Sequence, residues 1–166
     1  MEIRVESPDD FAAIGEVVEA AFGKQDEVRL VDAVRASDGY VPELSLVAVD
    51  GAEIVGHVML SYVGLDGSDR RLLELAPLAV APARQHEGIG GALTRDALAR
   101  ADAAGEPLVL VLGHAEYYPR FGFRPSTELG LEPPDERLRP VFFAAPLGAY
   151  EKTISGRIVF PPAFEA

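Results

Sequence analysis

Apolar and polar residues recur along this chain with two different periods, and the period changes from one segment to the next. Residues 2–6 alternate apolar with charged side chains, which predicts a strand. Residues 11–22 place apolar side chains at helical spacing, after Ser7 and Pro8, which favour a helix start, and before Gly23, which favours a helix end. The same reasoning predicts a helix over 27–36, strands over 44–50, 53–63 and 71–80, a helix over 88–103, a strand over 108–112, a short helix over 114–121, and strands over 141–145 and 154–159.

The order of these elements is βααβββαβαββ, and it predicts an α/β (α+β) fold. Asp50-Gly51 marks a hairpin between two strands, so the first strands are expected to be antiparallel. The fully apolar strand at 108–112 is expected to be covered on both faces. We therefore predict a mixed, mostly antiparallel central sheet with helices on both faces. At 166 residues we expect one domain, 1–166, in which the proline-rich residues 132–140 form a loop.

Charge and composition narrow the range of partners. The formal net charge is −12, with two lysines and no basic run, so neither nucleic acid nor an anionic membrane surface is an expected partner. The charge suits a cationic substrate such as an amine slightly better than an anion, although it also fits solubility alone. Without an apolar run of membrane-spanning length or a signal peptide, we expect a cytoplasmic protein. Cysteine is absent and the three histidines are scattered, so we expect no metal.

The junction after the 71–80 strand carries the most specific chemistry. A loop with Gln85, Gly88 and Gly90 leads from that strand directly into a helix. The first N–H groups of a helix have no internal partner and attract phosphate. The spacing matches neither a Walker loop nor the three-glycine dinucleotide motif. Taken alone, the glycines fit either a phosphate site or a simple tight turn.

Pro77 lies inside the same strand. Proline lacks an N–H and is normally confined to strand edges or bulges, so pairing with the neighbouring strand is predicted to stop near this point. The strand then either ends early or splays away. In the second case an extended ligand with amide groups would pair with residues 78–80 like an added strand.

These segments resemble the GNAT superfamily of N-acetyltransferases, and within it the small bacterial YhbS-like group. The resemblance rests on Leu78-Ala-Val-Ala-Pro82 followed by Gln85-x-x-Gly88-x-Gly90, and on Tyr118-Pro-Arg-Phe-Gly-Phe123 some thirty residues later. The segments 112–124 and 156–164 are also similar to the YhbS-like form, so the resemblance spans most of the chain. It implies a GNAT-like fold and transfer of an acetyl group from acetyl-CoA, the co-substrate, to an amine.

The resemblance also implies roles for individual residues. Tyr118 would lie near the sulfur as general acid, with Tyr117 as the runner-up. Glu74 would be the general base, with His57, His114, Glu116 or a water chain as alternatives. The backbone of the last strand residues would hold the pantetheine, and the loop amides would bind the diphosphate; these cofactor-binding residues are Leu78, Ala79, Val80, Gln85, His86, Glu87, Gly88, Ile89 and Gly90.

Three questions stay open at this level. Glu87 adds an anion beside the expected diphosphate, so its side chain either points to solvent or weakens the binding of CoA. Because the net charge of the chain disfavours the polyanionic CoA, binding would also depend on local arginines, namely Arg84, Arg95, Arg120 and Arg124. The acceptor is a small-molecule or peptide amine without a motif, and a homodimer is possible because closing strands often pair between subunits in this superfamily. The alternatives to acetyl transfer are a non-catalytic CoA-binding module and transfer of a longer acyl group.

Overall fold

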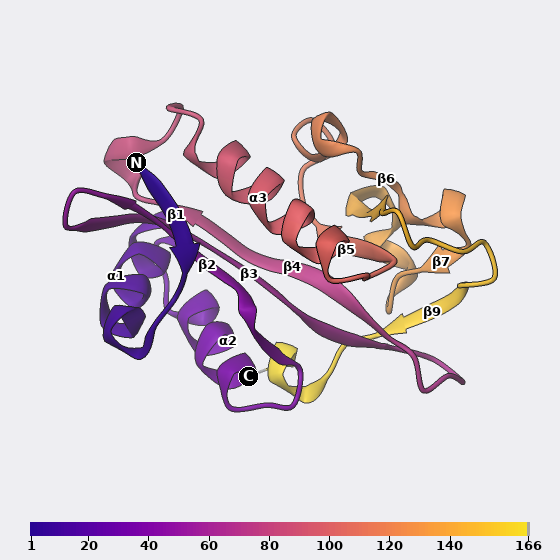
Figure 1. The fold of residues 1–166 in the computed structure, drawn as a ribbon. Coiled ribbons are helices and arrows are strands. Elements are labelled where there is room, and N and C mark those ends of the chain that lie inside the picture. Colours follow the sequence, from indigo (N-terminus) through magenta and orange to yellow (C-terminus); the bar gives the residue numbers. More distant parts are fainter. Residues whose placement is uncertain (166) are drawn as a thin grey trace.

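The fold is a large twisted sheet between two layers of helix (Figure 1). The computed structural model describes residues 1–165. Its main elements are β1 (Glu2–Val5), α1 (Phe11–Phe22), α2 (Asp26–Arg35), β2 (Tyr40–Asp50), β3 (Glu53–Leu65), β4 (Arg71–Val80), α3 (Ile89–Ala103), β5 (Leu108–Leu112), β6 (Arg124–Pro125), β7 (Leu131–Glu132), β8 (Phe142–Pro146) and β9 (Gly156–Val159).

The sheet follows the order β1-β2-β3-β4-β5-β8-β6, with β9 pairing to the far end of β3 and to β7. Neighbouring strands along this path are antiparallel except β4 and β5, which are parallel. A parallel pair needs a crossover connection, and α3 supplies it. The predicted mixed, mostly antiparallel sheet is confirmed.

Helices cover both faces, as predicted. α3 packs on one face through Leu93 and Ala97, over a core that includes Leu73 and Leu75 of β4. α1 and α2 pack on the opposite face, above Val47 and Met59 respectively. Strand side chains alternate between these two layers, so neighbouring residues of one strand enter different cores.

A buried polar network fastens α2 to the sheet. Two bonds join the Arg35 guanidinium to the Glu6 carboxylate, at 2.9 and 3.0 Å, and the Tyr40 hydroxyl donates to the same carboxylate at 2.6 Å. The Glu6 side chain is 1% exposed, so the network replaces the water that this charge has lost. Arg35 also lies over the Phe11 ring, 3.8 Å from its centroid, which ties the two helices together.

Residues that start or end an element in the sequence analysis do so in the structure, whereas several predicted lengths differ. Pro8 opens a 3₁₀ turn that runs into α1, and Gly23 ends α1 with a φ of 72°. The hairpin after Asp50 forms, with Gly51 and Ala52 as the loop residues.

Three expectations about lengths were wrong. The helix expected over 114–121 is only a 3₁₀ turn, Tyr118–Phe121, because Pro119 lacks the N–H that a longer helix would need. β2 starts four residues earlier than predicted, since a register shift after Tyr40 interrupts its alternation. The loop expected over 132–140 contains the end of β7 and a 3₁₀ segment, Glu136–Val141.

Candidate active site

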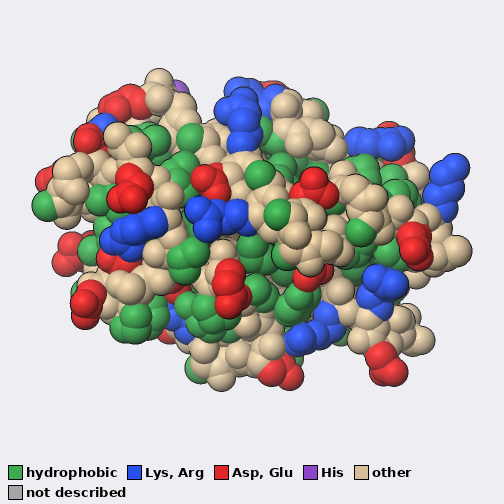
Figure 2. Space-filling model, viewed as in Figure 1, with side chains coloured by type: hydrophobic (Ala, Val, Ile, Leu, Met, Phe, Trp, Pro, Cys, Tyr) green, Lys and Arg blue, Asp and Glu red, His purple; other side chains and the backbone are tan. Residues whose placement is uncertain are grey.

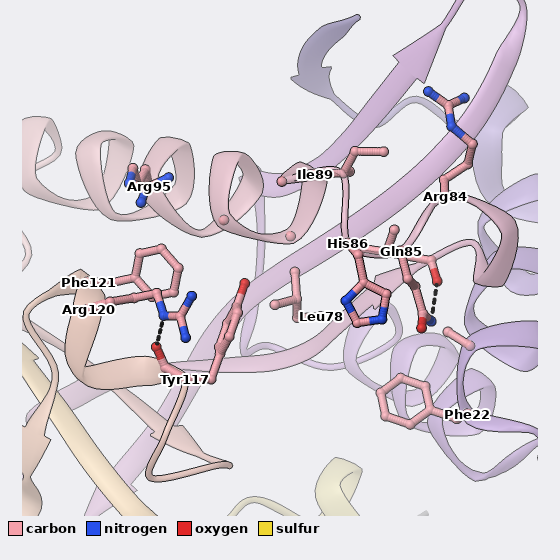
Figure 3. Close-up of a pocket in the computed structure, with 15 residues that line it drawn as sticks. Phe22, Leu78, Arg84, Gln85, His86, Ile89, Arg95, Tyr117, Arg120 and Phe121 are labelled. Atoms are coloured by element: carbon pink, nitrogen blue, oxygen red, sulfur yellow. Dashed lines mark hydrogen bonds between the residues drawn. The ribbon is translucent and has the colours of Figure 1, made fainter.

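The parallel strands β4 and β5 separate in the middle of the sheet, next to Pro77 of β4. β4 pairs with β5 only at Leu73, Glu74 and Leu75, while residues beyond Pro77 pair only with β3. Alternate residues of an antiparallel strand direct their N–H and C=O groups to opposite edges. Because the Ala81 N–H donates to Val55 of β3, the main chain of Ala79 also faces β3, and the main chains of Leu78 and Val80 face the gap. At this edge the Val80 carbonyl accepts a hydrogen bond from Gln85 Nε2 at 3.2 Å (Figure 3). The splay that Pro77 predicted is present.

The loop between β4 and α3 presents unpaired N–H groups beside this gap. His86 has a φ of 68° and Gly88 a φ of 86°, so the chain turns sharply between β4 and α3. None of the N–H groups of residues 85–88 donates to an acceptor among residues 1–165. α3 begins at Ile89, so its first N–H groups also lack a helical partner.

A hollow of about 690 Å³ joins the gap to this loop. Figure 3 shows Tyr117 and Arg120 on one side of it, and Gln85, His86 and Phe22 on the other. Gly90 forms part of its wall, and a Cβ at this position would lie 3.1 Å from the Tyr117 hydroxyl. Seven of the nine predicted cofactor-binding residues line the hollow: Leu78, Val80, Gln85, His86, Gly88, Ile89 and Gly90.

The other two predicted residues, Ala79 and Glu87, do not line the hollow. Ala79 is buried against α1. The Glu87 carboxylate accepts from Arg84 at 3.0 Å, and Arg84 also pairs with Asp50 at 2.9 Å. The acid is therefore paired with a cation of the same loop and does not line the hollow.

Tyr118 lies where β5 ends. Its ring lies on the backbone of Gly113, where a Cβ would come within 2.3 Å of the ring, so only glycine leaves room for it. Tyr117 and Phe123 hold the ring in edge-to-face contacts, with centroids 5.0 and 5.4 Å away. Burial raises the pKa of Tyr118 to about 12, and its hydroxyl has no hydrogen-bond partner within the described residues. The phenol is thus a protonated donor without an acceptor.

Glu74 lies on β4, one residue before its pairing with β5 ends. Its side chain is almost fully buried, and burial raises its pKa to about 8. One of its carboxylate oxygens lacks a partner, as does the buried Ser61 hydroxyl on the residue paired with it in β3. Because Leu73 and Leu75 face α3, the intervening Glu74 faces the opposite layer. Tyr118 belongs to the core beneath α3, so the two groups approach the end of the β4–β5 pairing from opposite faces.

The other candidate bases occupy different surroundings. His57 is fully buried, with Nδ1 3.0 Å from the Leu46 carbonyl, and burial lowers its pKa to about 4. His114 and Glu116 are exposed and line a second hollow of about 490 Å³, which shares Tyr117 and Arg120 with the first. Residues 1–165 contain no group of three or more potential ligands placed to hold a metal ion.

Comparison with known proteins gives this arrangement a family. The sequence model of a family described as an acetyltransferase (GNAT) domain matches residues 2–126, three quarters of the chain. The chain belongs to the GNAT acetyltransferase family. The chain is 36% identical over 155 residues to an uncharacterized N-acetyltransferase of Escherichia coli K12, YjhQ, and this match covers 90% of this chain and 86% of that protein.

Two solved structures extend the GNAT likeness to the whole fold. One is a GNAT family acetyltransferase from Brucella melitensis in complex with acetyl-CoA, 35% identical, with a TM-score of 0.81 over 98% of this chain and 97% of that one. The other is YhbS from Escherichia coli in complex with CoA, 26% identical, with a TM-score of 0.91 over 99% and 92% of the two chains. The GNAT assignment and the similarity to the YhbS-like group are therefore confirmed.

Several residues of this GNAT site carried no sequence signal. Ala21 and Phe22 reach the hollow from the end of α1, far from either motif in the chain. Phe121 lines it as well, although in the motif it occupies a variable position. Of the four arginines considered for CoA, three line the hollow, while Arg124 pairs with Glu128 at 3.1 Å outside it.

Charges of both signs share the surface of the molecule. Figure 2 shows Lys and Arg side chains interspersed with Asp and Glu on the face it presents. No helix in the described part of the chain is long and apolar enough to cross a membrane.

Proposed function

We propose that this GNAT protein transfers the acetyl group of acetyl-CoA directly to a primary amine while both substrates are bound. One observation carries the proposal: the main-chain edge at Leu78 and Val80, where strand pairing with β5 has ended and only Gln85 bonds the Val80 carbonyl, lies beside a loop with unpaired N–H groups that lines the same hollow. An edge of this kind pairs with amides, and such a loop binds phosphate. The complexes of the two similar structures with acetyl-CoA and CoA support the same ligand for this chain.

The residues of the hollow fit the parts of CoA in order. Leu78 and Val80 would pair with the amides of the pantetheine arm, and the N–H groups of residues 85–90 would bind the diphosphate. Gly90 keeps the wall open, since any side chain there would meet the Tyr117 hydroxyl. Acetyl-CoA supplies an activated thioester, whose thiolate leaves when the amine attacks.

Proton transfers at the two faces of the gap would complete the reaction. Tyr118, whose phenol stays protonated at neutral pH, would donate to the leaving sulfur. The ionised form of Glu74, whose fraction grows as the pH rises toward its pKa of about 8, would accept a proton from an ammonium whose pKa is about 10 in water. Because the two side chains lie on opposite faces, the amine would attack the thioester carbon from the Glu74 face, and the C–S bond would break with the thiolate leaving toward Tyr118.

The test is the release of free CoA thiol from acetyl-CoA across a panel of primary amines. We expect release that depends on the amine, with the N-acetylated product confirmed by mass spectrometry. Binding of acetyl-CoA without amine-dependent release would instead indicate a non-catalytic CoA-binding module. Glu87 favours that alternative only if its charge faces the diphosphate, and its carboxylate accepts from Arg84 instead.

A parallel comparison of acetyl-, propionyl- and succinyl-CoA tests the acyl group. We expect the acetyl thioester to give the highest turnover with the best amine of the panel. Faster turnover with a longer chain would replace acetyl transfer with the corresponding acyl transfer.

A further inference from the structure

Two of the arginines at the hollow carry an uncompensated charge. Arg84 is neutralised by Asp50 and Glu87, at 2.9 and 3.0 Å. Arg95 and Arg120 also line the hollow, yet neither pairs with a carboxylate within residues 1–165. These two cations line the same hollow in a chain whose net charge is −12. They create a local positive potential where the overall charge would repel an anion.

Arg95 occupies a position that its own helix disfavours. Its guanidinium lies over the Phe121 ring, 5.0 Å from the centroid, and Nη1 lies 3.2 Å from where a Cβ of Gly91 would be. The side chain thus turns back toward the first turn of α3, the positive end of the helix dipole. A cation gains nothing from that end, whereas an anion placed there would interact with both the guanidinium and the dipole.

Arg120 faces the same hollow from the opposite wall. Its Nε donates to the Tyr117 carbonyl at 2.9 Å and Nη2 to the Glu116 carbonyl at 3.3 Å. These bonds fix the plane of the guanidinium while its charge stays unpaired. Figure 3 shows Arg95 on α3 and Arg120 across from it, with Phe121 between them.

We infer that Arg95 and Arg120 together bind the 3′-phosphate of CoA. The inference rests on the proposed function, because it assumes that CoA occupies the hollow. The unpaired amides of residues 85–90 satisfy the diphosphate, and the pantetheine follows β4 away from them. The remaining anionic group of CoA is the 3′-phosphate, on the ribose at the other end of the diphosphate. Arg95 lies further along α3 than the loop, Arg120 lies on the 3₁₀ turn Tyr118–Phe121, and both line the hollow that the loop lines. Guanidinium groups are well suited to phosphate oxygens.

Calorimetric titration with CoA and with 3′-dephospho-CoA tests this assignment. We expect the unmodified protein to bind CoA roughly tenfold or more tightly than 3′-dephospho-CoA, the range of one or two charge-assisted hydrogen bonds. Arg95→Gln and Arg120→Gln should each weaken CoA binding while leaving the affinity for 3′-dephospho-CoA almost unchanged. Arg95→Lys keeps the charge and should retain part of the preference.

The matched control is Arg70→Gln, which removes one positive charge at the opposite end of β4. This variant should preserve the preference for CoA, which separates a local contact from a change in net charge. Equal affinities of the unmodified protein for both ligands, or equal losses for both ligands in the Arg95 and Arg120 variants, would overturn the inference and leave the proposed function standing. If neither ligand binds the unmodified protein, both proposals fail. Thermal unfolding of each variant checks that the fold is intact.

Discussion

Replacing Glu74 by glutamine should make the protein more stable at neutral pH and less active at the same time. The folded state raises the pKa of Glu74 to about 8 from a reference value of 4.5, because burial disfavours the charged form. Between these two values the unfolded chain loses the proton and the folded chain keeps it. Stability therefore falls as pH rises, by about 1.4 kcal/mol for each pH unit.

The size of the effect follows from the interval between pH 4.5 and the pH of the measurement. At pH 7 the interval is two and a half pH units, so burying Glu74 costs about 3 kcal/mol relative to a neutral side chain of the same shape. Glutamine stays uncharged at every pH. Glu74→Gln should then match the unmodified protein near pH 4.5 and exceed its free energy of unfolding by about 3 kcal/mol at pH 7.

The assay is urea unfolding of both proteins from pH 5 to pH 8.5, together with kcat at pH 7.5. Glu53→Gln, at an exposed strand end, serves as the control and should leave the pH dependence unchanged. If the curves of the Glu74→Gln variant and the unmodified protein run parallel across this range, the argument from burial is refuted. An unchanged kcat would remove Glu74 from the proposed chemistry, whereas a loss of tenfold or more would support it.

Three further variants probe other parts of the structure. Tyr118→Phe should lower kcat by about 10²-fold or more while raising the KM for acetyl-CoA much less, because it removes only the proposed proton donor; steady-state kinetics with unchanged turnover would contradict this. Gly90→Val should weaken acetyl-CoA binding at least about tenfold in a direct titration, since its side chain would meet the Tyr117 hydroxyl; retained affinity would show that the hollow tolerates the side chain. Arg35→Met should lower the free energy of unfolding by about 3–5 kcal/mol, because Glu6 would keep a buried charge without its cation; a change below about 1 kcal/mol in chemical denaturation would show that water reaches the carboxylate.

The local features of the site could be predicted from sequence because each depends on a single residue type. Pro77 has no N–H, so the end of strand pairing was visible in the chain itself. Gly88 adopts a φ of 86°, and a glycine at a strand–helix junction signals such a turn. The segment Tyr118-Pro-Arg-Phe-Gly-Phe123 indicates Tyr118 by its pattern alone, without its position beside Gly113.

Long-range arrangement could not be predicted in the same way. That Tyr118 and Glu74 lie on opposite faces follows from the register of β4 with β5, which no local pattern specifies. Which arginine is neutralised depends on partners distant in sequence, as with Arg84 and Asp50. Phe22 reaches the hollow only because α1 packs across β4, and its helical spacing gave no indication of this.

The position of the gap within the sheet has a consequence for which molecules reach it. Exposed strand edges at the rim of a sheet invite pairing with foreign chains, and proteins usually shield them. Here the edge of Leu78 and Val80, which pairs with no strand, lies at the centre, with β3 on one side and β5 and β8 beyond the opening. We expect a slender, flexible arm to enter between the diverging strands more readily than a broad polypeptide with bulky side chains. The fold thus keeps hydrogen-bonding groups at its centre and away from a rim where foreign strands could pair.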